Sequence, residues 1–120
     1  MSENVIKTKS FNFALRIIKL FQFLNQEKKE FVLSKQLLRS GTSIRALVRE
    51  SEQAESKKDF IHKLAIAQKE ANETDYWLEL LFQSDYFNQT QFQSIKSDII
   101  EINKILASII ITTKQKLATK

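Results

Sequence analysis

Two carboxylates, Glu70 and Glu73, stand three residues apart and would share one face of a helix. Paired metal sites in four-helix bundles need inward carboxylates and also two Glu-x-x-His pairs. This chain has a single histidine, His62, and no glutamate stands three residues before it. Lys69 and Glu73 are spaced i, i+4, which favours a surface ion pair instead. We therefore predict no metal site and no other cofactor.

Three hydroxyl side chains, Ser40, Thr42 and Ser43, surround Gly41, the only glycine in the chain. Nucleophilic catalysis would need a base beside them, and neither a second histidine nor a strand-to-helix elbow is present. A phosphate-binding loop would need several glycines and a lysine at fixed spacing. We predict that the protein is not an enzyme and that Gly41 allows a neighbouring helix to approach closely.

Basic residues offer a different chemistry. A basic stripe lies opposite Ile44 and Val48 on one expected helix, covers an arc of about 120°, and consists of Lys35, Arg39, Arg45 and Arg49. Arg16 and Lys19 form a smaller cluster on the preceding helix. Guanidinium groups bind phosphate in a two-pronged geometry, so these six residues are predicted to bind nucleic acid. Alternatively, Glu50, Glu52 and Glu55 pair with Arg45 and Arg49 within or between subunits.

Four long helices are expected to position these residues. The 120-residue chain has no proline and one glycine, which is typical of helices joined by short turns. The first should run over 10–25 behind an N-cap at Ser10, and the second should begin at the N-cap Ser34. The third should cover 57–82, with Ser56 and Asp59 as a variant capping box, and the fourth 90–117. The prediction is a flexible N-terminus (1–9) and one all-α, antiparallel up-down-up-down four-helix bundle (10–118).

Apolar spacing marks the inward face of each helix. The expected inward residues are Phe13, Ile17, Leu20 and Leu24; Leu37, Gly41, Ile44 and Val48; and Phe60, Leu64, Ala67, Ala71, Thr74 and Leu78. The fourth helix has apolar residues around more than half of its circumference, and Phe11, Leu15, Ile18 and Phe21 spill off the stripe of the first. The surplus predicts a homo-oligomer; the alternative is deep burial of the fourth helix within its own bundle.

Charge is unevenly distributed along the chain. The net charge of +5 divides into +7 over residues 1–49, −5 over 50–85 and +3 over 86–120. Trp77 stands among acidic residues, so we expect it to fill a gap between helices, with its indole N–H bonded to an acceptor. Cysteine is absent, Met1–Ser10 is polar, and no segment has the roughly 18 apolar residues of a membrane span. We expect a cytoplasmic protein that does not enter a membrane.

Three segments carry a family resemblance: RSGTSI (39–44), ESEQAESKKDFIHKLAIA (50–67) and KEANETDYWLELL (69–81). They resemble a bacterial four-helix bundle family first noticed as reading frames in the intervening sequences of large-subunit ribosomal RNA genes. The resemblance implies rings of five copies. The architecture is also similar to the accessory protein of diversity-generating retroelements, a basic pentameric barrel that binds nucleic acid and a reverse transcriptase. After Ser-Ile the family pattern continues Gly-Ala-Asn, whereas this chain has Arg45-Ala46-Leu47.

Together these observations lead to two functional hypotheses. The leading one is a non-enzymatic, ring-forming homopentamer that binds RNA or DNA backbone through its basic stripe. The alternative is an oligomeric protein-interaction scaffold that does not bind nucleic acid. The resemblance adds a reverse transcriptase, or another protein, as an implied partner.

Overall fold

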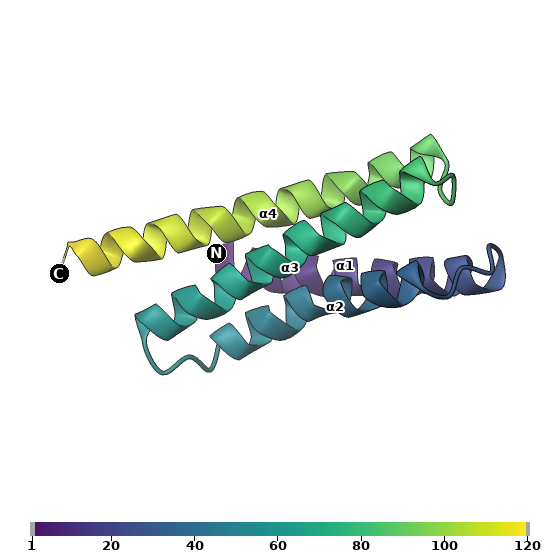
Figure 1. The fold of residues 1–120 in the computed structure, drawn as a ribbon. Helices are drawn as coiled ribbons and strands as arrows, with labels where there is room; N and C mark the ends of the chain where they lie inside the picture. Colours follow the sequence, from purple (N-terminus) through teal and green to yellow (C-terminus); the bar gives the residue numbers. More distant parts are fainter. Residues whose placement is uncertain (1, 120) are drawn as a thin grey trace.

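The computed structural model describes residues 2–119, which fold into four helices and no strand (Figure 1). The helices are α1 (Ser2–Gln26), α2 (Leu33–Ser51), α3 (Lys57–Gln83) and α4 (Gln89–Ala118). Each helix packs against the next, and α4 returns to contact α1, so the bundle closes around one core. Its extents of 53 × 22 × 20 Å are those of an elongated bundle. The predicted all-α, antiparallel four-helix bundle is confirmed.

The N-cap of α3 is as predicted, although the Asp59 carboxylate accepts from the N–H of Glu55 rather than from that of Ser56. The start of α4 has a full capping box. The Ser56 hydroxyl accepts a hydrogen bond from the backbone N–H of Asp59 at 3.0 Å. At the start of α4, the Asn88 side chain accepts from the N–H of Gln91, and the Gln91 side chain accepts from the N–H of Asn88. Each cap satisfies N–H groups that have no partner within the helix.

The start of α1 differs from the prediction. Ser10 is not an N-cap, because it lies buried inside α1 and its hydroxyl donates to the carbonyl of Ile6 at 2.6 Å. Residues 2–9, predicted to be a flexible N-terminus, are helical, and Ile6 belongs to the core. Met1 lies outside the described residues. A serine can occupy a buried helical position when its hydroxyl bonds back to a carbonyl of the preceding turn.

The N-cap predicted at Ser34 is also wrong. Glu30 caps α2 instead, since its carboxylate accepts hydrogen bonds from the N–H groups of Val32, Leu33 and Ser34 at 2.7–3.2 Å. The Ser34 hydroxyl donates back to the Glu30 carbonyl at 2.9 Å. A carboxylate at this position satisfies three free N–H groups and faces the positive end of the helix dipole.

The core follows the predicted stripes, with Leu20 and Phe60 only partly buried. Most apolar residues of α4 are used inside the bundle, and its buried members are Ile95, Ile99, Ile102, Leu106, Ile109 and Ile110. Among its described residues only Ile100 and Ile111 are exposed large hydrophobics. The broad apolar face of α4 is therefore explained mainly by burial in its own bundle. The larger exposed apolar group lies on α1.

Gly41 has the role predicted for it. A Cβ added to Gly41 would lie 2.7 Å from Cγ1 and 2.9 Å from Cγ2 of Ile17. Ile17 belongs to α1 and is fully buried. The missing side chain thus lets α1 and α2 pack closely at the middle of the bundle.

Candidate interaction surface

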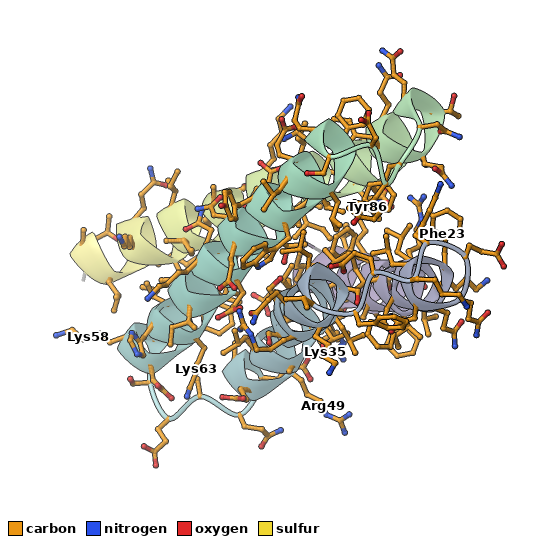
Figure 2. The ribbon with its side chains drawn as sticks, turned by 45° about the vertical axis from the view of Figure 1, so that its right-hand side comes forward. Phe23, Lys35, Arg49, Lys58, Lys63 and Tyr86 are labelled. Carbon is orange, nitrogen blue, oxygen red and sulfur yellow. The ribbon has the colours of Figure 1, made fainter. Side chains whose placement is uncertain are left out.

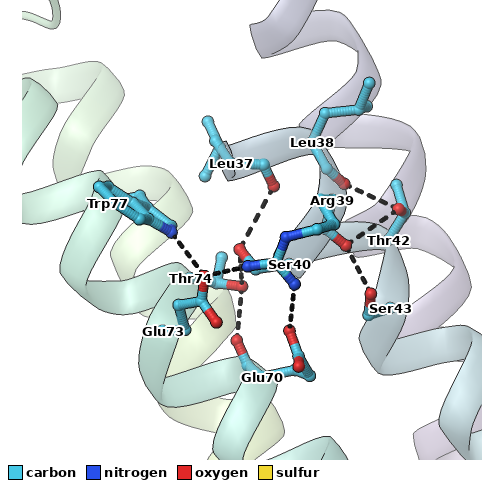
Figure 3. Close-up of polar contacts among 10 residues, drawn as sticks. All are labelled: Leu37, Leu38, Arg39, Ser40, Thr42, Ser43, Glu70, Glu73, Thr74 and Trp77. Carbon is cyan, nitrogen blue, oxygen red and sulfur yellow. Dashed lines mark hydrogen bonds and ion pairs between the residues drawn. The ribbon is translucent and has the colours of Figure 1, made fainter. Parts of the chain in front are cut away.

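Arg39, the second residue of the basic stripe, is held by α3. Its guanidinium donates to Glu70 at 3.2 Å and also to Glu73, and the carboxylate of Glu73 accepts from the indole N–H of Trp77 at 3.0 Å (Figure 3). We call these four residues the Arg39 clasp. Trp77 therefore finds the acceptor expected for it. The predicted Lys69–Glu73 pair is not formed within the described residues, because Glu73 reaches across to α2 instead.

The hydroxyl cluster beside the clasp is bonded within the protein. Buried Thr74 donates to the Ser40 hydroxyl at 2.9 Å or to the Glu70 carbonyl at 2.8 Å (Figure 3). Thr42 and Ser43 donate to carbonyls one turn earlier on α2, at 2.7 and 2.6 Å. Such bonds fix the side chains and place no base next to any of them.

Two more of the six predicted nucleic-acid contacts are also paired. Arg45 donates to Glu52 at 3.3 Å, and Glu52 lies 3.7 Å from Lys7 of α1. Arg16 reaches α4, where it pairs with Asp98 at 2.5 Å and donates to the Ser94 hydroxyl at 2.9 Å. The pairing of Arg45 with a downstream glutamate was the alternative kept for the basic stripe.

Three of the six residues point freely outward. Lys19, Lys35 and Arg49 are exposed, and none forms an ion pair with a carboxylate in the described part of the chain. Figure 2 shows Lys35 and Arg49 projecting from α2 on the side away from α4. They are fourteen positions apart, which is about 21 Å along a helix. The structure thus divides the basic stripe: Arg39 turns to α3, Arg45 stays beside Glu52, and the other two face outward.

An exposed apolar ridge runs along α1. It consists of Phe11, Leu15 and Ile18, whose exposed fractions are 54%, 46% and 39%. Their spacing of four and three residues places them on one face of the helix. The ridge was visible in the sequence as residues outside the main stripe, and it is the largest group of exposed apolar side chains on one helix among the described residues.

No group of three or more His, Cys, Asp or Glu side chains could hold a metal ion between residues 2 and 119. His62 is exposed on α3. No helix of this part of the chain is long and apolar enough to cross a membrane.

Comparison with known proteins assigns the chain to a family. Residues 2–108 match the family described as 23S rRNA-intervening sequence protein. The chain belongs to this family. A crystal structure of a protein with unknown function from the S23 ribosomal protein family, from Bacteroides thetaiotaomicron VPI-5482, is 61% identical, with a TM-score of 0.91. The alignment covers 92% of this chain and 98% of that one. No curated protein matches the chain.

In this member of the 23S rRNA-intervening sequence protein family, the segments that carry the resemblance meet between α2 and α3. Segment 39–44 supplies Arg39 and Ser40, and segment 69–81 supplies their partners Glu70, Glu73 and Thr74. These residues hold the two helices together. Arg45, which departs from the family pattern, belongs to the face of α2 that borders α1.

Proposed function

We propose that this protein is a self-associating, non-enzymatic scaffold that works as a homo-oligomer. The apolar ridge of α1 carries the proposal. Three large apolar side chains in a row, each more than a third exposed, form a contiguous patch of the kind that often marks a contact with another protein. The family resemblance supports a closed ring of five copies.

Light scattering after size exclusion tests the proposal across a range of concentrations. The wild-type chain should have a mass of several subunits, and Leu15→Glu should be monomeric because it places a charge in the centre of the ridge. Ile100→Glu on α4 is the matched control, since Ile100 is 43% exposed and Leu15 is 46% exposed. The control should keep the wild-type mass. A wild-type monomer at every concentration, or dissociation by Ile100→Glu alone, would refute the proposal.

A second candidate function is binding of RNA or DNA backbone. It is favoured by the three outward cations Lys19, Lys35 and Arg49, which have no carboxylate partner in the described residues. Three cations per subunit would give weak binding for one copy, and an assembly that leaves them uncovered would repeat them and add avidity. Phosphate contacts of this kind position a protein without reading sequence.

Fluorescence anisotropy with a labelled duplex RNA, at low and moderate salt, tests this second function. Lys19→Gln, Lys35→Gln and Arg49→Gln combined should abolish binding. The matched control replaces three exposed lysines of α4, Lys104, Lys114 and Lys116, by glutamine and should retain it. Wild-type affinity should fall with salt at a log–log slope of about 0.9 per phosphate neutralised. Equal losses in the two triple variants would indicate net charge rather than a site.

A further inference from the structure

We infer that copies of this chain join head to tail, with the α1 ridge of one copy seated on the outward face of α3 of the next. The inference rests on the proposed self-association and goes further by naming the two surfaces that meet. Two observations support it: the position of the ridge on the surface, and the comparison of the charges around the ridge with those around other exposed apolar groups.

The ridge borders α2. Lys7, Phe11, Ile18 and Asn25 are spaced four, seven and seven residues apart, so they form one line along α1. Both ends of this line contact α2: Lys7 approaches Glu52, and Asn25 donates to the Ser34 hydroxyl at 3.2 Å. The opposite side of α1 contacts α4 through Lys9 and Arg16. The ridge therefore lies on the outer surface shared by α1 and α2.

The part of α2 beside the ridge is cationic. Ser34 and Arg45 of α2 and its C-cap residue Glu52 lie on one line, at spacings of eleven and seven residues. Both ends of that line contact α1. Arg45 is therefore next to the ridge, and Arg49 follows it one turn later. We define the ridge face as the apolar ridge with its surrounding cations, which are Lys7, Lys19, Lys35, Arg45 and Arg49. A contact through this face would cover Lys19, Lys35 and Arg49, so it competes with nucleic-acid binding by those three residues. Glu52 is the one carboxylate paired within this set.

The outward face of α3 has the complementary character. Tyr76 is 57% exposed, and its ring lies 4.9 Å from that of Trp77. Ile66 and Leu80 are partly exposed on the same side of the helix. The nearby carboxylates outnumber the cations by one. They are Glu50, Glu70, Glu73, Asp75 and Glu79, against Arg39, Lys63, Lys69 and Lys96. We define the α3 face as Ile66, Tyr76, Trp77 and Leu80 with these charges.

The other surfaces available to the ridge face carry the wrong charge. The apolar residues exposed on α4, Ile100 and Ile111, are accompanied by Lys104 and Lys114. A contact of two ridge faces would likewise bring cations against cations. Like charges across an interface oppose association, whereas opposite charges favour it. Of the exposed apolar groups on α3 and α4, the α3 face is therefore the better match.

Two different surfaces in contact make a heterologous interface, which either closes into a ring or continues as a filament. This predicts a result that a contact of one face with the same face of a second copy cannot give. Leu15→Glu disables the ridge face and keeps the α3 face, while Tyr76→Lys does the reverse. Each variant alone should be monomeric in light scattering, and an equal mixture should form a complex of two chains and no more. Circular dichroism checks that both variants keep their helices.

Lys69→Glu is a second test variant, and it is expected to strengthen the contact between subunits rather than to break it. Lys69 is exposed on α3, and its replacement makes the α3 face more acidic. The assembly should then persist on dilution to a concentration at least several-fold lower than for the wild type. Unchanged or weaker assembly would contradict the inference.

The remaining outcomes separate the two proposals. Wild-type mass for Tyr76→Lys together with a monomeric Leu15→Glu would overturn the head-to-tail contact and leave self-association standing. A mixture that stays monomeric would also overturn the pairing of these two faces. A wild-type chain that is itself monomeric would overturn both proposals.

Discussion

The contact between α2 and α3 differs in kind from the contact between α1 and α4. The buried hydroxyl pair of Ser40 and Thr74 joins α2 to α3, with the Arg39 clasp above it, and α3 has two small, fully buried core residues nearby, Ala67 and Ala71. Between α1 and α4 there are two ion pairs at half-exposed side chains, Lys9–Glu101 at 3.0 Å and Arg16–Asp98 at 2.5 Å.

This difference predicts which contact of the bundle resists opening more. Small side chains allow backbones to approach closely, and buried, satisfied hydrogen bonds specify one register. Half-exposed ion pairs are each worth about 0–1 kcal/mol and weaken with salt. We therefore expect the α1–α4 contact to open first and the α2–α3 contact to persist. The hydroxyls and the Glu70 and Glu73 pair that could have suggested catalysis serve the stable contact.

Gly41→Ala should produce the largest change, because it disturbs the closely packed part of the bundle. The new Cβ would lie 2.7 Å from Ile17, a branched core residue with little freedom to move. Overpacking of this kind costs about 1–3 kcal/mol, from which the better helix propensity of alanine recovers about 1 kcal/mol. Urea unfolding followed by circular dichroism should show a net loss of stability.

The double variant Gly41→Ala with Ile17→Ala is the control for this mechanism. Ile17→Ala removes both γ-carbons that the new Cβ would meet. The two substitutions together should therefore destabilise the protein less than the sum of the single effects. Strict additivity would show that the clash with Ile17 is not the cause.

Arg39→Gln tests the α2–α3 contact, and Arg16→Gln is the matching substitution in the α1–α4 contact. Arg39→Gln should cost about 1 kcal/mol, because it removes hydrogen bonds to two carboxylates, of which Glu70 is the more buried. Arg16→Gln should cost at most about 0.5 kcal/mol, and less at high salt. Trp77 is the only tryptophan, and its N–H bonds to Glu73, so its fluorescence should change with Arg39→Gln alone. Equal costs and equal fluorescence changes would remove the distinction between the contacts.

Much of the fold follows from sequence periodicity. The stripe of Leu37, Gly41, Ile44 and Val48 is buried as the spacing predicted, since one face of each helix must pack inward. The same periodicity indicates that α1 begins before Ser10. Ile6, Ser10, Phe13 and Ile17 follow the helical spacing of four and three residues. A serine in that series looks like a cap until its hydroxyl is seen to bond to a carbonyl.

Sequence periodicity could not predict the N-cap of α2 or the ion-pair partners of the basic stripe. Glu30 caps α2 from three residues before its start, a position that the usual Ser, Thr, Asp or Asn pattern does not cover. A helical wheel places Arg39 on an outward arc but contains no information on the helix beside it. Its partners Glu70 and Glu73 are 31 and 34 residues away in sequence. Only the packing of α2 against α3 brings them together.

The smallest change in stability is expected from substitutions in the connections between helices. These substitutions test whether the connections influence which of the two helix contacts opens first. Lys29, in the α1–α2 connection, and Asp85, in the α3–α4 connection, have positive φ values of 55° and 68°. Glycine adopts this conformation without steric cost, although it also gains entropy when unfolded. Lys29→Gly should therefore raise stability by about 0.5 kcal/mol, and Asp85→Gly by less, because aspartate tolerates the left-handed region better. Neither substitution should change which contact opens first in hydrogen exchange, since both relieve strain outside the helices. A reversal of that order would mean that the connections, rather than the residues between the helices, set the difference.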